Sequence, residues 1–167
     1  PAGVLNVVIC RNEEAELMLK DERLKMLSFT GSAEVGWALK AQAGKKKVVL
    51  ELGGNAAVIV DRSSQIDEAV SAIAKGAYLY AGQICISVQR IFVDHSIFDQ
   101  FVEKFKQAVS ELKVGAPNIE GVTVGPLIDR THLERILNWV NEALTQGADV
   151  LIGGEIVDLD HHLFAPT

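Results

Sequence analysis

The sequence predicts an α/β fold, in which an open, mostly parallel sheet is flanked by helices. Short apolar runs of the kind that form buried strands alternate with longer stretches in which apolar residues recur at the helical period. One run, from Ala57 to Val60, contains no polar residue, which is typical of a strand covered by helices on both faces. These two observations together indicate strands and helices that alternate along the chain.

The strands are expected where the apolar runs are short. These runs are residues 5–10, 25–29, 48–52, 56–61, 90–94 and 150–152. Cys10 ends the first of them, and we expect it to be a small residue of the core.

The helices are expected where polar caps precede periodic stretches. Ser32 precedes a helix over about residues 33–43, and Ser64 can cap the next one. Thr131 and Glu134 have capping-box spacing at the start of the last helix, which Gly147 ends. The apolar stripes of the later helices are Ile66, Ala69, Val70, Ile73, Ala74 and Ala77; Ile97, Phe101, Phe105, Ala108 and Leu112; and Leu133, Ile136, Leu137, Val140 and Leu144.

Composition excludes several classes of partner. The net charge of −6 argues against nucleic acids and anionic membranes, because both are bound by basic surfaces. No apolar run approaches the roughly 18 residues of a membrane-spanning helix. Two distant cysteines cannot form a disulfide framework, so we expect a reducing, cytoplasmic location and a small molecule as partner.

Two segments before residue 60 have the residue types of a binding site. Phe29-Thr30-Gly31-Ser32 lies where a strand ends and a helix begins, and the free amides at a helix start attract phosphates. An ordinary capped turn explains the same residues. Glu51 lies in an apolar strand just before Gly53-Gly54, where a raised pKa would suit a general base. A solvent-facing edge strand explains Glu51 equally well.

A third segment carries a thiol. Cys85 follows a helical stretch that ends near Gly82 and precedes a strand, so it lies on a connection where a thiol is accessible. A single cysteine does not establish reactivity, and a structural role remains open on these residues alone.

The three segments together resemble the NAD(P)-dependent aldehyde dehydrogenase superfamily, in this order and at these separations. The resemblance extends over the whole chain, from Pro1-Ala2-Gly3-Val4 through Val124-Gly125-Pro126 to Pro166-Thr167. It implies the family's catalytic-domain fold. Residues 1–46 would be the C-terminal remnant of the dinucleotide-binding domain, and residues 47–167 a truncated catalytic domain that bears the thiol.

The resemblance also implies roles for individual residues. Cys85 would be the nucleophile, and Glu51 the general base that activates water. The residues expected to contact NAD or NADP are Gly31, Ser32, Ala33, Glu34, Val35, Gly36, Leu52 and Gly53. The substrate would be a small-molecule aldehyde, oxidised to a carboxylic acid through a thiohemiacetal and a thioester. The run from Ile86 to Ile91 is most similar to members that act on small hydroxyaldehydes such as lactaldehyde.

The chain corresponds to about a third of such an enzyme. The asparagine that completes the oxyanion site and the lysine that holds the adenosine ribose would precede Pro1, and a second ribose anchor would follow Thr167. We therefore expect the 167 residues alone to bind the cofactor poorly and to be inactive, and the parent enzyme to be a homo-oligomer.

Two functions of other classes compete with this one. A cysteine–histidine hydrolase would need a histidine in a recognisable signature beside Cys85, and none of the histidines provides it. A truncated, non-catalytic relative that acts as a binding module remains the alternative. The run Asp158-Leu159-Asp160-His161-His162 is expected to be an exposed turn and no metal site, because it lacks cysteine partners and helical histidine spacing.

Overall fold

A computed structural model describes all residues from Pro1 to Thr167 and divides them into two compact units, Pro1–Gly53 and Gly54–Thr167. Each unit is described by itself. The domain boundary expected between residues 46 and 47 stays a prediction. In this structure strand β2 (Lys47–Glu51) belongs to the first unit, because its backbone pairs with strand β1 (Met26–Thr30).

The first unit has the order α1 (Asn12–Lys20), β1, α2 (Ala33–Gln42) and β2. Strands β1 and β2 are parallel, with Thr30 opposite Glu51 at their carboxyl ends. The Lys46 ammonium donates to the Asp21 and Leu24 carbonyl oxygens, at 2.6 and 2.8 Å. This contact fixes the start of β2 against the turn that leads into β1.

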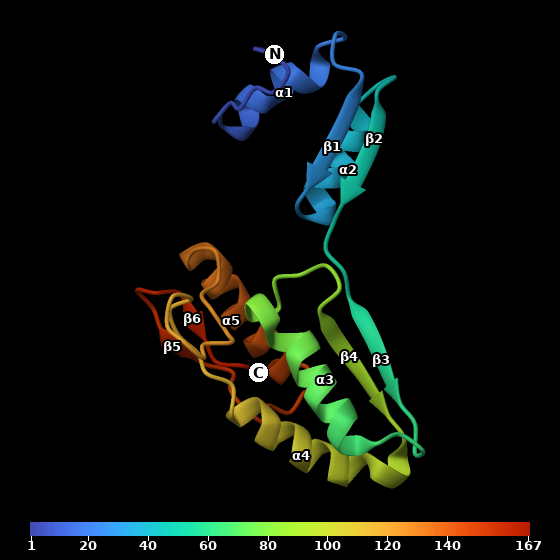
Figure 1. Ribbon diagram of the computed structural model, residues 1–167, viewed down its shortest axis with the longest axis vertical. Helices are drawn as coiled ribbons and strands as arrows, with labels where there is room; N and C mark the ends of the chain where they lie inside the picture. The colour runs from blue at the N-terminus through green and yellow to red at the C-terminus, as the bar shows by residue number, and fades with distance from the viewer. The chain divides into compact units, whose positions relative to one another are not determined.

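The second unit contains two strand pairs and three long helices (Figure 1). Strands β3 (Ala56–Val60) and β4 (Val88–Val93) are parallel, and β5 (Ile156–Asp158) and β6 (Leu163–Phe164) form an antiparallel pair. The helices are α3 (Ile66–Tyr78), α4 (Phe98–Ser110) and α5 (Arg130–Thr145), with short 3₁₀ segments η1 (Leu79–Gly82) and η2 (His95–Ile97). The predicted α/β class with parallel strands and flanking helices is confirmed.

Two clusters of buried residues hold this unit together. Val60 of β3, Val70 and Ile73 of α3, and Phe101 of α4 form the first, so α3 and α4 cover one face of the β3–β4 pair with their apolar stripes. Ile59 on the other face is 79% exposed, so the expectation that this apolar run is covered by helices on both faces is wrong in this structure. Leu133 of α5, which is fully buried, forms the second with Leu127 and Phe164. The helical stripes predicted from the sequence supply much of both clusters. None of the helices combines the length and apolarity needed to cross a membrane.

Two predicted strands are wrong. Residues 5–10 form no strand and are exposed, Ile9 almost completely, because no other strand offers its backbone a ladder of hydrogen bonds. Cys10 is consequently exposed, which corrects the expectation that it belongs to the core. Residues 150–152 form no strand either, and the strands of this region lie later, at β5 and β6.

Helix α1 and two helix caps differ from the sequence-based expectation. The Glu14 carboxylate accepts from the Arg11 amide at 2.7 Å and stabilises the start of α1. The sequence does not predict this helix, because it has no periodic apolar stripe. Helix α3 begins after Gln65 instead of Ser64. Asp129 caps α5 by accepting from the His132 amide at 2.8 Å, so the predicted Thr131–Glu134 capping box is wrong and the helix begins earlier.

Candidate active site

Cys85 lies on a short connection between η1 and β4, and it is exposed. The Ser87 amide donates to the Ile84 carbonyl at 3.0 Å, which closes a tight turn around the cysteine. The predicted accessible connection between a helix and a strand is therefore present. Exposure alone does not single out Cys85, since Cys10 is exposed as well.

The backbone before this connection is left-handed at residues that are not glycine. Tyr80 and Ala81 have φ of 54° and 55°, and Gly82 follows with φ of 71°. Such conformations cost on the order of 1 kcal/mol or more for residues that carry a Cβ, so the surrounding structure must hold them. The turn bearing the thiol is thus entered through a strained segment.

Gly54 lies against the backbone of Cys85. A Cβ atom on Gly54 would overlap the carbonyl oxygen of Cys85, so only glycine fits. The side-chain amide of Gln89 donates to the Gly54 carbonyl at 3.0 Å, and the Arg90 guanidinium donates to the Asn55 carbonyl at 3.0 and 3.3 Å. The first residues of the second unit are therefore fixed to the strand that follows Cys85.

Glu51 ends strand β2 in the other unit. Its side chain is exposed, on the same face as Val49 and opposite Val48 and Leu50, as alternation along the strand predicts. In this unit Lys47, Val49 and Glu51 of β2 are all exposed, so the face that carries Glu51 is open to solvent. Only Leu52 and Gly53 separate it in sequence from Gly54. The role of Glu51 as a base stays a prediction.

The segment predicted to face the cofactor forms the start of α2. Residues 31–35 are exposed, and the Ser32 hydroxyl accepts from the Val35 amide at 3.3 Å. Gly36 is buried, and a Cβ atom there would overlap the Leu52 side chain. Leu52 is half-buried beneath α2, whereas Gly53 is exposed with open space around its Cα. Gly36 and Leu52 thus pack α2 onto the β1–β2 pair, which fixes the direction of its first amides.

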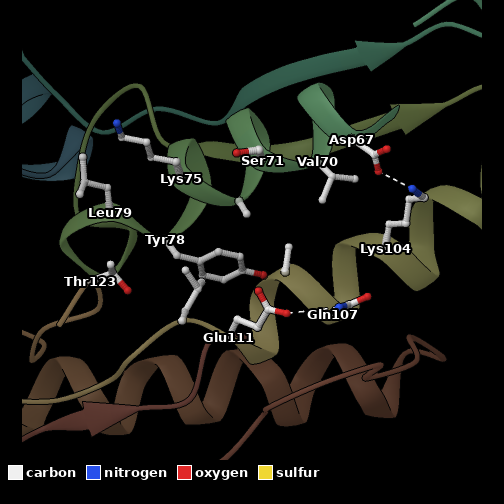
Figure 2. Close-up of a pocket in the computed structure, with 13 residues that line it drawn as sticks. Asp67, Val70, Ser71, Lys75, Tyr78, Leu79, Lys104, Gln107, Glu111 and Thr123 are labelled. Carbon is white, nitrogen blue, oxygen red and sulfur yellow. Dashed lines mark hydrogen bonds and ion pairs between the residues drawn. The ribbon is translucent and has the colours of Figure 1, made fainter. Parts of the chain in front are cut away.

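A cleft of about 610 Å³ lies elsewhere in the second unit, between α3 and α4 (Figure 2). Asp67 of α3 pairs with Lys104 of α4 at one end, and the Tyr78 ring lies between the helices. Burial raises the pKa of the Tyr78 phenol, whose hydroxyl donates to the Thr167 carbonyl at 2.8 Å. None of the predicted site residues lines this cleft.

The acidic and histidine-containing run at 158–162 forms the turn between β5 and β6. The His161 ring contacts the Asp158 carboxylate at 2.9 Å, and this hydrogen bond raises the pKa of His161. The backbone amide of His161 and then its ring lower the pKa of Asp158. The pair closes the turn, and no group of three or more metal-ligating side chains forms around it.

The family is decided by comparison with known proteins. The model of the aldehyde dehydrogenase family matches residues 1–167. The chain belongs to the aldehyde dehydrogenase family.

Individual family members are similar along the whole chain. The chain is 42% identical to lactaldehyde dehydrogenase of Methanocaldococcus jannaschii. The match covers the whole of this chain and 36% of that protein. The chain is 39% identical to the NADP-dependent succinate-semialdehyde dehydrogenase GabD of Escherichia coli, again over its full length and 35% of that protein.

A solved structure agrees with the fold. Glyceraldehyde-3-phosphate dehydrogenase GapN of M. jannaschii, complexed with NADP, matches with a TM-score of 0.86 and 42% identity, over 91% of this chain and 33% of that one. The chain therefore spans about a third of the length of the family members it matches.

Proposed function

We propose that this chain carries the nucleophile and the general base of an NAD(P)-dependent aldehyde dehydrogenase, with Cys85 and Glu51 in these roles. The observation that carries the proposal is an exposed thiol on a tightly held turn, in a chain that belongs to this family throughout. The reaction is oxidation of an aldehyde to a carboxylic acid.

The first step forms a bond between the Cys85 sulfur and the aldehyde carbon. The carbonyl π electrons move to oxygen, and the resulting thiohemiacetal oxyanion is stabilised by the Cys85 backbone amide. When the oxyanion re-forms its double bond, the C–H bond breaks and a thioester remains on Cys85. NAD(P), when bound, supplies the acceptor for the hydride that departs.

The second step releases the acid. Glu51 takes a proton from water, the water oxygen bonds to the thioester carbon, and the C–S bond breaks to return the thiolate of Cys85. A carboxylate in this role favours hydrolysis over transfer to coenzyme A. Because Glu51 lies on an exposed strand face, it is open to water in the first unit.

The residues at the start of α2 fit a dinucleotide phosphate. The first amides of a helix lack acceptors within the helix. Here the residues that carry them are exposed, and the Ser32 hydroxyl accepts from one of these amides. Glu34 in the first turn is the one feature that opposes an anion. Residues 31–35 would hold the pyrophosphate, and Gly53 would lie near the nicotinamide.

The substrate class we propose is a small hydroxyaldehyde. The run from Ile86 to Ile91 supports it, as does the similarity to a lactaldehyde dehydrogenase and, at 40% identity, to a 3-sulfolactaldehyde dehydrogenase of Priestia megaterium. The parent would act as a homo-oligomer in a reducing, cytoplasmic setting, which agrees with two free cysteines.

Selective alkylation tests whether Cys85 is an activated thiol. We expect iodoacetamide to modify Cys85 at least about tenfold faster than Cys10 in the native full-length protein. The thiolate is the form that reacts with iodoacetamide, and the proposed role of Cys85 as nucleophile requires a reactive thiolate, whereas Cys10 has no such role. Both cysteines are exposed, so accessibility does not explain a difference. Peptide mass mapping over time measures the two rates. Equal, slow modification of both would count against the proposal.

The isolated 167 residues are expected to be inactive. The chain spans about a third of its relatives, and dinucleotide affinity depends on contacts along the whole cofactor. Absorbance at the wavelength of the reduced cofactor, with lactaldehyde and either NAD or NADP, measures this beside the full-length protein. An aldehyde-dependent rise with the 167-residue polypeptide would overturn the expectation.

A further inference from the structure

The side chain of Gln83, two residues before Cys85, bridges the nucleophile turn and a distant segment. Its Nε2 donates to the Tyr80 carbonyl at 3.0 Å and to the Pro126 carbonyl at 3.2 Å. Its Oε1 accepts from the Ile128 amide at 3.2 Å. These partners fix which end of the amide is nitrogen, because two carbonyls require donors and one amide requires an acceptor.

The carbonyl of Tyr80 belongs to the left-handed segment that leads into the turn. The Gln83 backbone amide also donates to this carbonyl, at 3.1 Å, so backbone and side chain hold it together. A left-handed conformation at Tyr80 and Ala81 is unfavourable by itself and persists only when contacts enforce it. Gln83, which follows this left-handed segment and precedes the turn at Ile84–Ser87, supplies such contacts.

Ser87 holds the other side of the cysteine. Its side chain is buried, and its hydroxyl lies 3.3 and 3.2 Å from the Gly76 and Ala77 carbonyls at the end of α3. The buried Ser87 side chain therefore fixes the backbone after Cys85, and the Gln83 side chain fixes the backbone before it. Of the two, only Gln83 connects the turn to residues 126–128.

We propose that Gln83 is a positioning residue that sets the orientation of the Cys85 thiol. The proposal rests on the proposed function, in which Cys85 is the nucleophile. Gln83 does not contact the reacting atoms. Its three hydrogen bonds hold the turn against residues 126–128, so that the thiol meets the aldehyde carbon in one geometry.

The test is the substitution Gln83→Glu in the full-length protein. The carboxylate has the same shape and still accepts from the Ile128 amide, but it repels the Tyr80 and Pro126 carbonyls. We expect kcat and the rate of Cys85 alkylation each to fall at least about tenfold at neutral pH, with little change in the KM for NAD(P).

The pH profile separates positioning from a general loss of structure. Protonation of the introduced carboxylate in Q83E restores one donor, so the alkylation rate of Cys85 relative to Cys10 should recover as the pH falls toward the glutamic acid range. The control Gln42→Glu makes the same charge change at a glutamine that donates to the Ala38 carbonyl in α2. It should leave both the relative rate and kcat unchanged.

The kinetics of the variants either support or overturn the role of Gln83 in positioning the Cys85 thiol. A folded Q83E with wild-type kcat and alkylation rate would overturn the proposal. If Q83E does not fold, Gln83→Met removes the hydrogen bonds without adding charge, and a folded Q83M with wild-type rates would overturn it equally. If the wild-type protein reduces no cofactor with any aldehyde, the proposed function fails. The alkylation rates still report whether Gln83 controls Cys85.

Discussion

Replacing Cys85 by serine in the full-length protein is expected to lower kcat for aldehyde oxidation by about 10³-fold or more, while the fold is retained. The side chain is exposed and contributes to neither core cluster, so the substitution removes little packing. Serine matches the shape of cysteine, but at neutral pH its hydroxyl forms far less of the reactive anion. Initial rates of cofactor reduction measure the effect.

The matched control is Cys10→Ser. Cys10 is the other exposed cysteine and lies in the first unit, in a segment without regular structure. It should leave kcat unchanged. Wild-type turnover by the Cys85→Ser protein, with circular dichroism showing an intact fold, would instead mean that the thiol takes no part in the reaction.

The substitution Gly54→Ala is expected to lower kcat/KM by about 10²-fold, without altering any side chain of the proposed mechanism. A Cβ atom at this position overlaps the carbonyl oxygen of Cys85, so one of two backbone segments must move. Displacement of a reacting group by about 1 Å costs roughly that factor. Steady-state kinetics and the Cys85 alkylation rate should both show it.

Gly125→Ala is the control for this substitution. Gly125 has no positive φ, and a Cβ atom there meets no other heavy atom within 4 Å. The same chemical change should therefore leave catalysis near the wild-type level. Normal kinetics in a folded Gly54→Ala protein would mean that the Cys85 backbone can move without affecting catalysis. The close contact between Gly54 and the Cys85 carbonyl would then have no role in the reaction.

The sequence predicted the strands and helices where the pattern is local and periodic. Strands β1 to β4 and helices α2 to α5 lie within a few residues of their predicted positions. Helices α3 to α5 bury periodic apolar stripes, whereas α2 buries only Gly36 and is indicated by the cap residue Ser32. The run at residues 5–10 has the same apolar character and forms no strand. A strand depends on a neighbour as well as on its own residues, and sequence periodicity contains no information about that neighbour.

The candidate site was predictable only in part. The position of Cys85 between a helical stretch and a strand predicts an exposed connection, and Cys85 is exposed in the structure. The contacts of Gln83 cannot be predicted from the sequence, because Pro126 and Ile128 lie 43 and 45 residues away in the sequence. The requirement for glycine at position 54 cannot be predicted from the sequence for the same reason, because only the folded chain brings the Cys85 carbonyl close to Gly54.

The ladder between β3 and β4 is irregular at one point, where Ala56 and Ala57 face Val88 and Arg90 and thereby skip Gln89. This extra residue is the one whose side-chain amide reaches Gly54. Removing or adding a residue here would turn every later side chain of β4 to the opposite side of the sheet, so that Ile91 and Val93 would leave the core. Packing of β4 therefore fixes the number of residues between Cys85 and the core residues Ile91 and Val93, independently of any requirement of catalysis.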